Sequence, residues 1–179
     1  MTGVQTCALP ISPERQAEVA RQVGLGSLKY AMLARDNNKV VIFDLEEALS
    51  FDGHSAPYIQ YAHARASRIL ENSDRPIEQI AADAPGVDFG SLSAEELTLL
   101  QALAAFPGEI EKSAEEYRPL LIATYVYELA KAFNEFYHGH PVLNSEEPLK
   151  TARLVLVAAV RQVLANGLAL LQIEAPDQM

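Results

Sequence analysis

Apolar residues recur at helical spacing along most of the chain, and turn-forming residues separate the periodic stretches. The longest stretch opens at Pro119 and continues to about His138, with apolar side chains three or four positions apart. Another stretch, from Pro57 to Leu70, has a proline in its first turn, where the missing N–H costs no hydrogen bond. Both stretches are therefore predicted to be long amphipathic helices.

The part of the chain before residue 55 predicts shorter elements. Ser12 and Pro13 occupy positions suited to a helix start, and this helix is expected to end at Val23, before Gly24 and Gly26. The further expected elements are a helical segment at 27–36, a strand or extended segment at 39–44, and a short helix that Asp44 caps and that ends near Leu49.

The second half of the chain predicts more helices with short connections. Breaks between 71 and 92 leave room for one short helix at about 75–82. Ser93 and Glu96 form a capping box that opens a helix to about Ala105. The other expected features are an end to that helix at Pro107 and Gly108, a helix at 109–117, and a last helix capped by Asn144 and Ser145 that runs to about Asn166 before Gly167. Five or so helices joined by short turns predict an all-α fold, a helical bundle.

Composition narrows the class of protein. The chain has 179 residues, of which 49% are hydrophobic and 21% are charged, as in a globular protein with a substantial core. The longest apolar run, at 154–160, is shorter than a membrane span requires, so a transmembrane protein is not expected. The single cysteine, Cys7, excludes an internal disulfide and is typical of a cytosolic protein. A net charge of −10 argues against nucleic-acid binding by overall charge, but it leaves binding through a local patch open.

One stretch carries side chains suited to single-stranded nucleic acid. Tyr58 and Tyr61 lie three residues apart, and Arg65 and Arg68 follow on a neighbouring stripe of the same predicted helix. Bases stack on aromatic rings, and guanidinium groups attract phosphates. The spacing alone more often indicates tyrosines packed in a core with arginines at its rim.

Four stretches, in the same order, resemble the class I arginyl-tRNA synthetase family. GHSAPYIQYAHAR at 53–65 is similar to the segment with which that family enters its anticodon-binding domain. VGLGSLKYAML at 23–33, followed by VIFDLEEALSFDG at 41–53, resembles the end of the catalytic body. ATYVYELAKAFNEFYHGHPVL at 123–143 resembles the central helix of the anticodon domain, and TARLVLVAAVRQVLANGLALLQIEAPDQM at 151–179 resembles its C-terminus.

The resemblance implies a fragment of arginine–tRNA ligase, whose family attaches arginine to its tRNA with ATP and Mg²⁺. Residues 13–54 are expected to be a remnant of the catalytic body, and residues 55–179 a helical anticodon-binding domain. Because no HIGH-type or KMSKS-type sequence occurs, we expect the fragment to lack the catalytic site and to bind no cofactor. The expected partners are arginine tRNA and the missing catalytic domain, without DNA or membrane, in a cytoplasmic monomer.

Residues 1–12, MTGVQTCALPIS, do not fit this scheme, because they contain no charge and no periodicity. They resemble the translation of a sequencing adapter fused to a truncated gene. We expect this segment to be disordered and Cys7 to have no function.

The resemblance adds candidate RNA contacts to Tyr58, Tyr61 and Arg65. Tyr137 matches an aromatic residue that lies against the anticodon loop in this family, although a core position at a helix end fits equally well. Met179 matches a terminal residue that closes over a base, and a frayed tail is the alternative.

Four other charged or titratable sets have simpler explanations. Arg161 is suited to reach a phosphate, whereas Arg153 either does the same or ties its helix to a carboxylate. His138 and His140 lack a nearby third metal ligand, which favours turn-lining or RNA-facing positions. The pairs Glu95–Glu96 and Glu115–Glu116 are expected on solvated faces.

The chain also departs from the family pattern in two places. Leu120 and Leu121 stand where PHRLATYLY has a histidine and an arginine, which puts a phosphate contact there in doubt. Gln172 replaces a frequent glycine of LLGIEAP, which puts the local turn geometry in question. Two alternatives stay open: a helical protein-interaction module with exposed apolar patches, and the anticodon domain of another class I synthetase such as the cysteinyl enzyme, which the IEAPDQM ending disfavours.

Overall fold

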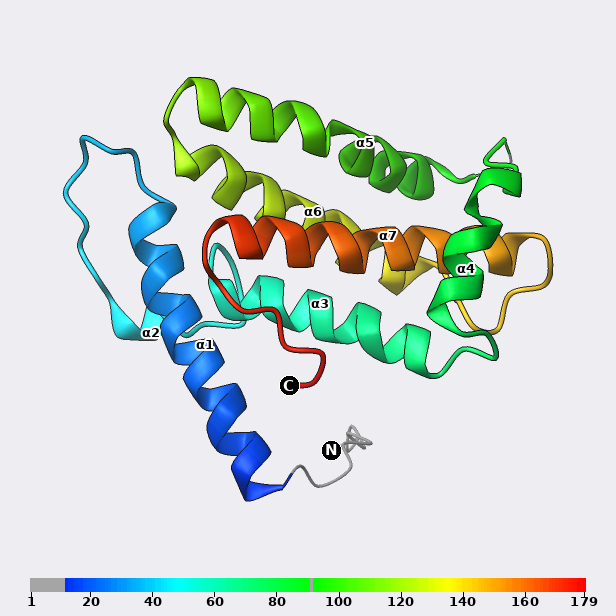
Figure 1. The fold of residues 1–179 in the computed structure, drawn as a ribbon, viewed down its shortest axis with the longest axis horizontal. Helices are drawn as coiled ribbons and strands as arrows, with labels where there is room; N and C mark the ends of the chain where they lie inside the picture. Colours follow the sequence, from blue (N-terminus) through cyan, green and yellow to red (C-terminus); the bar gives the residue numbers. More distant parts are fainter. Residues whose placement is uncertain (1–11, 91) are drawn as a thin grey trace.

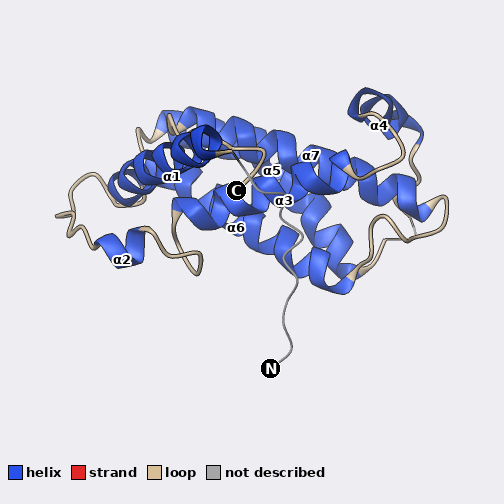
Figure 2. Cartoon of the chain, turned by 90° about the horizontal axis from the view of Figure 1, so that it is seen from below, coloured by secondary structure: helices blue, strands red, loops and turns tan. Residues whose placement is uncertain are grey.

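The computed structural model describes residues 12–90 and 92–179, and all regular secondary structure in this part is helical. The elements are α1 (Pro13–Leu33), α2 (Leu45–Ala48), α3 (Ala56–Glu71), α4 (Ile77–Asp83), a 3₁₀ turn (Ala84–Gly86), α5 (Ala94–Glu115), α6 (Pro119–Gly139) and α7 (Leu149–Leu170). Figure 2 shows helices and connecting loops only. The all-α prediction is therefore confirmed. The expectation of disorder at 1–12 falls, except for Ser12, outside the described residues.

α7 is the central helix of the bundle. It packs against α3, α4, α5 and α6, while α5 and α6 form a long hairpin beside it (Figure 1). α1 crosses the end of the bundle and packs against α3 and α6. The helix at the start of the chain is thus part of the same packed body.

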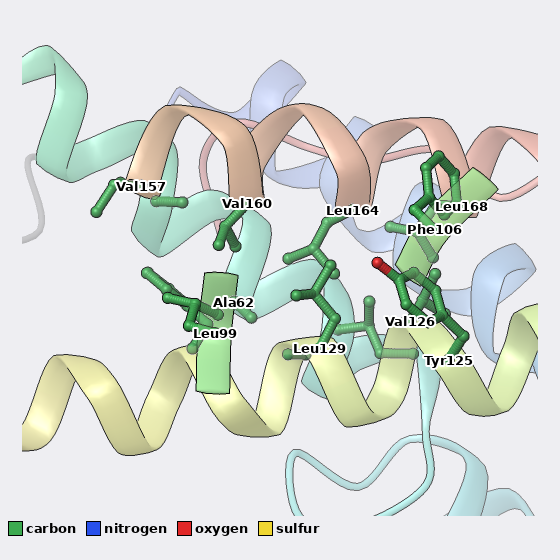
Figure 3. Packing of buried hydrophobic residues seen from close by; sticks show 14 of the residues in the cluster. Ala62, Leu99, Phe106, Tyr125, Val126, Leu129, Val157, Val160, Leu164 and Leu168 are labelled. Carbon is green, nitrogen blue, oxygen red and sulfur yellow. The ribbon is translucent and has the colours of Figure 1, made fainter. Parts of the chain in front are cut away.

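The core lies where α7 faces α3, α5 and α6. Leu129 of α6, Leu164 of α7 and Leu99 of α5 point into this space, and each is at most 1% exposed (Figure 3). Full burial of one such side chain stabilises the fold by about 1.5–3 kcal/mol relative to exposure. Because several helices contact α7, its apolar residues extend over most of its circumference.

By length and composition alone, α7 is apolar enough to cross a membrane, with a mean hydropathy of 1.5 over its most apolar window. The helix is longer than the apolar run at 154–160 that the sequence argument considered, so run length was the wrong criterion. Half of that window is buried inside the bundle. Core packing thus accounts for the apolar composition.

The predicted glycine stops are wrong, because these glycines lie inside helices. Gly24 and Gly26 belong to a continuous α1, and Gly167 belongs to α7. A Cβ at Gly167 would lie 2.3 Å from Cγ1 of Val126, so the glycine lets α6 and α7 approach closely. At Gly26 a Cβ would lie 3.0 Å from Nε2 of Gln60 on α3. Both positions serve packing between helices, which local sequence rules do not detect.

Pro107 also lies inside a helix, α5, which joins the two helices predicted at 93–105 and 109–117. A proline removes one N–H from the helix and disturbs the carbonyls of the preceding turn. In that turn the carbonyl of Ala102 accepts a hydrogen bond from the Tyr125 hydroxyl at 2.9 Å. The Tyr125 ring stacks on Phe106, with 5.4 Å between centroids. Contacts from α6 thus support the irregular turn.

Two further expectations need correction. Residues 40–44 form a loop, because no strand lies beside them among the described residues to complete a sheet. The last helix begins at Leu149, and Asn144 and Ser145 do not cap it. Ser145 instead accepts a hydrogen bond from Arg153 at 2.7 Å.

The helix starts predicted at Ser12, Asp44 and Ser93 are confirmed. Ser12 accepts a hydrogen bond from the Arg15 N–H at 3.3 Å, and Asp44 accepts one from Glu47 at 2.9 Å. Ser93 and Glu96 form the reciprocal capping box. These are contacts within one turn of helix, so local sequence determines them.

Candidate nucleic-acid interface

Three predicted site residues, Tyr61, Arg65 and Tyr137, come together on the surface between α3 and α6. Tyr61 and Arg65 lie one turn apart on α3, and Tyr137 lies in the last turn of α6. The Cζ atom of Arg65 is 4.7 Å from the Tyr61 ring centroid and 5.1 Å from the Tyr137 ring centroid. The guanidinium is therefore within cation–π distance of both rings. We call these three residues the Arg65 cluster.

Hydrogen bonds fix the position of the Arg65 guanidinium. Nη2 donates to the Tyr61 hydroxyl at 3.0 Å, and Nη1 donates to Oδ1 of Asn134 at 3.4 Å. Six other arginines pair with carboxylates: Arg21, Arg68, Arg75, Arg118, Arg153 and Arg161. Arg65 forms no ion pair with the carboxylates that the structure describes, so no acidic partner neutralises its charge. The cluster is therefore a local positive site in an acidic chain.

The two rings of the cluster remain accessible to solvent. Tyr61 is 41% exposed and Tyr137 is 39% exposed. Phe51, which is also exposed, meets Tyr61 edge-on with 6.2 Å between centroids. Exposed aromatic rings beside an unneutralised cation provide stacking surfaces for bases and a partner for phosphate.

Tyr58 occupies a different part of the same α3–α6 seam. It is half-buried, and its ring lies 5.4 Å from that of Tyr127 on α6. His54 stacks on the Tyr127 ring, with 3.6 Å between the ring centroids. Because α3 and α6 run side by side in the same direction, the first turn of α3 meets Tyr127 and only the later turns meet Asn134 and Tyr137. The tyrosine pair is thus divided between a packed position and an exposed one.

The remaining arginine candidates make internal contacts. Nε of Arg161 donates to Oγ of Ser67 at 2.8 Å, and its Nη2 bonds Asp177 at 2.8 Å. Nε of Arg153 lies 2.6 Å from the Glu96 carboxylate, so this arginine ties its helix to a carboxylate, as one of the two alternatives predicted. Glu96 is only 1% exposed, which corrects the expected solvated position.

The environment of Glu96 keeps it ionised. Burial acts to raise the pKa of Glu96, but the hydrogen bond from the Ser93 N–H and the neighbouring Arg153 guanidinium outweigh it. The resulting pKa is below the ordinary value of a glutamate. A stable charge pair therefore joins the start of α5 to the start of α7.

His140 and the C-terminus make contacts outside the Arg65 cluster, whereas the His138 ring lies 6.4 Å from that of Tyr137. Nδ1 of His140 donates to the Phe136 carbonyl at 3.1 Å, and the imidazole stacks on the Phe136 ring. His138 is exposed. In the described part of the chain, no group of three His, Cys, Asp or Glu side chains is arranged to hold a metal ion. Met179 is half-buried at the end of a tail that lies along α3.

Sequence reasoning missed Asn134 and Phe51. Asn134 lies three residues before Tyr137 on α6, so helical spacing alone indicated that it shares the face of that tyrosine. Phe51 lies in the loop before α3, and no periodicity in a loop predicts which residue it meets.

Comparisons with known proteins show which family the chain belongs to. The model of the DALR anticodon binding domain family matches residues 59–179. Arginine–tRNA ligase of Pyrococcus abyssi is 46% identical over 170 residues, which cover 94% of this chain and 27% of that protein. The corresponding protein of Clostridium botulinum is 39% identical over 168 residues, with 93% of this chain and 29% of that protein covered. This chain thus spans under a third of the length of either relative.

Solved structures give the same result. Thermus thermophilus arginyl-tRNA synthetase superposes with a TM-score of 0.81 and 32% identity, over 98% of this chain and 29% of that one. The Plasmodium falciparum enzyme, at 21% identity, shares the fold with a TM-score of 0.80. The comparisons do not favour an interaction module or the cysteinyl enzyme. The chain therefore belongs to the arginyl-tRNA synthetase family, and it corresponds to the C-terminal part that carries the DALR anticodon-binding domain.

Proposed function

We propose that this chain binds the anticodon loop of arginine tRNA as part of an arginine–tRNA ligase. The observation that carries this proposal is the Arg65 guanidinium, held between two exposed tyrosines without a carboxylate partner among the described residues. Arg15 and Arg35 also form no ion pair among the described residues, so what distinguishes Arg65 is its position between two exposed aromatic rings.

Single-stranded loops are recognised by bases that leave their own stack and lie on protein side chains. Tyr61 and Tyr137 offer two such ring faces, and Arg65 offers a charge for the phosphate between the bases. Each stacked base contributes about 1–3 kcal/mol. Tyr58, being half-buried, supports the seam and presents less of its ring. The base read at this site is, in our proposal, the central cytosine of the anticodon.

The other candidate residues receive different roles. Arg161 is held by Ser67 and Asp177, so we propose that it orders the C-terminal tail and meets RNA only through its exposed edge. Met179 ends that tail and is proposed to close over a base.

The ligation reaction itself belongs, in this proposal, to the rest of the enzyme. Family members named arginine–tRNA ligase would join arginine to tRNA with ATP and Mg²⁺ through an arginyl-adenylate. The residues present here do not fit ATP or Mg²⁺. The described part has no metal-binding cluster, and the sequence has no HIGH-type or KMSKS-type signature. We therefore propose that this chain alone does not form the adenylate. Arginine-dependent pyrophosphate exchange by the purified chain would contradict this.

An exposed apolar surface supports a second partner, the remainder of the synthetase. Leu25, Leu28 and Met32 form an exposed stripe on α1, and Val40 and Ile42 in the next loop are more than 80% exposed. Apolar patches of this kind mark contact surfaces. We propose that the catalytic domain covers them in a cytoplasmic, monomeric enzyme that binds neither DNA nor membranes. Concentration-dependent dimers of this chain, measured by sedimentation, would indicate that a second copy covers the patch instead.

A binding titration tests the anticodon proposal. The ligands are arginine tRNA and the same tRNA with its central anticodon base changed, at one fixed salt concentration. The changed base should weaken binding, and Tyr61→Ala should weaken binding of the unchanged tRNA by ~1–3 kcal/mol. Tyr117→Ala is the matched control, because Tyr117 is 83% exposed and lies outside the cluster. Equal affinity for both tRNAs would refute specific recognition by this chain.

A further inference from the structure

The C-terminal tail, residues 171–179, is held along one side of α3 rather than projecting from the bundle. In Figure 1 the tail (red) leaves the end of α7 and passes over α3. The tail is in contact with α3, α7 and α1, and each helix contributes named polar contacts. α7 contributes the bond from Arg161 to Asp177. α1 lies outside the residues 59–179 that the DALR family model matches.

Three buried polar side chains of α3 bind successive groups of the tail. Nε2 of Gln60 donates to the Glu174 carbonyl at 2.8 Å, Nδ1 of His63 lies 2.9 Å from the Pro176 carbonyl, and Oγ of Ser67 donates to Asp177 at 2.9 Å. The three side chains are at most 3% exposed. Positions i, i+3 and i+7 form one stripe of a helix, so α3 presents a continuous polar row to the tail.

α1 holds the same tail from its other side. Nη2 of Arg21 lies 2.8 Å from the Glu174 carboxylate, and Nε2 of Gln22 donates to it at 2.9 Å. The Lys29 ammonium donates to the Gln172 carbonyl. A Cβ at Gly26 would lie 3.1 Å from Cγ2 of Ile173, so the missing side chain lets the tail approach the helix. Four positions over two turns of α1 thus contact three consecutive tail residues.

The tail and the exposed residues Tyr61 and Arg68 lie on different faces of α3. Gln60 and Ser67, which bind the tail, each precede by one residue the exposed Tyr61 and Arg68. One residue corresponds to a rotation of about 100° around the helix. The tail therefore lies on a different face of α3 from Tyr61, and its link to RNA is Met179, which ends the tail and is proposed to close over a base.

We propose that α1 is a positioning element of the RNA-binding surface: through Arg21 and Glu174 it holds the C-terminal tail, which ends at Met179, in place on α3. The predicted effect on RNA binding rests on the proposed function, whereas the predicted effect on the position of the tail does not. The residues responsible act through the tail and are positioning residues. It follows that the functional unit includes α1 and is larger than the matched domain.

The test uses the full chain with Arg21→Glu, which replaces an attraction to Glu174 by a repulsion. The first measurement is hydrogen exchange of the tail amides, including Ile173, whose N–H donates to the Leu168 carbonyl. We expect exchange there to become about tenfold faster, since an exposed ion pair is lost and a like-charge pair is gained. Exchange in α3 and α7 should not change. The double variant Arg21→Glu/Glu174→Arg should restore the slow exchange.

The second measurement is the tRNA titration. Arg118→Glu is the control, because this substitution changes the charge by the same amount. Arg118 also has two carboxylate partners, Asp36 and Glu116, and neither belongs to the tail. Arg21→Glu should weaken binding about two- to threefold more than this control, because only the molecules with a positioned tail bind tightly. The charge-swapped double variant should recover the affinity.

The outcomes separate the two proposals. Unchanged tail exchange in Arg21→Glu would overturn the positioning role of α1. Faster exchange with the same tRNA affinity as Arg118→Glu would overturn the link between the tail and RNA. If the unmodified chain shows no tRNA binding that depends on Tyr61, the proposed function fails, and the exchange measurement still decides whether α1 holds the tail.

Discussion

Arg65 illustrates how the neighbours of a residue decide its chemical role. Its side chain contacts two phenol rings and an amide oxygen, whereas Arg153, in the same chain, is buried against Glu96. The first arrangement leaves the charge available to a ligand. The second satisfies the charge inside the protein.

The planar shape of Arg65 should matter as much as its charge. Arg65→Lys keeps the charge but loses the flat surface that lies against the rings and the bond geometry to Tyr61 and Asn134. We expect tRNA binding to weaken by ~1 kcal/mol, a typical cation–π energy at an exposed site. The free energy of unfolding should also fall, by at most ~1 kcal/mol, because the contacts of the guanidinium with both rings and Asn134 are within the protein. Unaltered tRNA affinity would show that charge alone suffices.

Gln172 stands where the family frequently has a glycine, and its backbone conformation shows how this replacement affects the turn after α7. The turn after α7 forms, but Gln172 adopts φ of 58°, in the left-handed region. That conformation costs a residue with a Cβ about 1 kcal/mol. Gln172→Gly should therefore raise the free energy of unfolding by roughly 0.5–1 kcal/mol.

The control for this substitution is Gln162→Gly, at an exposed position inside α7. There glycine should lower the free energy of unfolding by about 1 kcal/mol. The comparison is made by urea unfolding monitored by circular dichroism. If both substitutions destabilise the protein equally, the strain at Gln172 is negligible.

At the scale of elements, close helix contacts and buried pairs join segments that are distant in sequence. α6 and α7 meet at Gly167, and α5 and α7 meet at the Glu96–Arg153 pair. Neither junction follows from the propensity of its own helix. Each can be tested by substitution at one position with a control on the same type of element.

Gly167→Ala should destabilise the bundle by ~1–3 kcal/mol, because the new Cβ would overlap Val126 unless the helices move apart. Gly108→Ala, inside α5 with no atom within 4 Å of the new Cβ, should instead stabilise the protein by about 0.5–1 kcal/mol. Adding Val126→Ala to Gly167→Ala should recover part of the loss. Thermal unfolding measures all three. A stabilising Gly167→Ala would mean that the helix contact is looser than described.

Glu96→Gln should lower the free energy of unfolding by about 3 kcal/mol, because it leaves the buried Arg153 without its counter-charge. Glu95→Gln, at the exposed neighbouring position, is the control and should change stability by less than ~0.5 kcal/mol. Because the folded pKa of Glu96 lies below the unfolded one, its contribution is present above about pH 4.5 and is lost as the pH falls through the folded pKa. The difference between wild type and Glu96→Gln should therefore shrink on acidification. A constant difference would contradict this.

At the scale of the whole molecule, a net charge of −10 surrounds a small positive site. An acidic surface repels RNA everywhere except where a cation lacks an acidic partner. This arrangement favours one orientation of the ligand and limits binding by overall charge.

The salt dependence of tRNA binding should therefore be shallow. Each phosphate contact on a single strand contributes a slope of about −0.7 to the logarithmic plot of affinity against salt. With few unneutralised arginines at the site we expect a total slope of about −2, and Arg65→Gln should reduce it by roughly one contact. A slope several times steeper would indicate an extended basic surface that the described residues do not provide.

The sequence by itself determined the helical class and most helix starts. Ser12, Asp44 and the Ser93–Glu96 box bond to N–H groups three residues away, so the local chain contains all the information. The resemblance also indicated Tyr61, Arg65 and Tyr137. Only the packing of α3 on α6, however, brings both tyrosine rings into contact with the Arg65 guanidinium.

Tertiary structure decided the rest, and the reason is the same in each case. Gly26, Pro107 and Gly167 have strong tendencies to end helices, yet contacts with other helices stabilise the continuous forms. Tyr58 packs against Tyr127 and Arg161 binds Asp177, while Tyr61 and Gln162, on the same two helices, stay exposed. The energies of these contacts depend on residues far away in the chain, and no local pattern records which partners will meet.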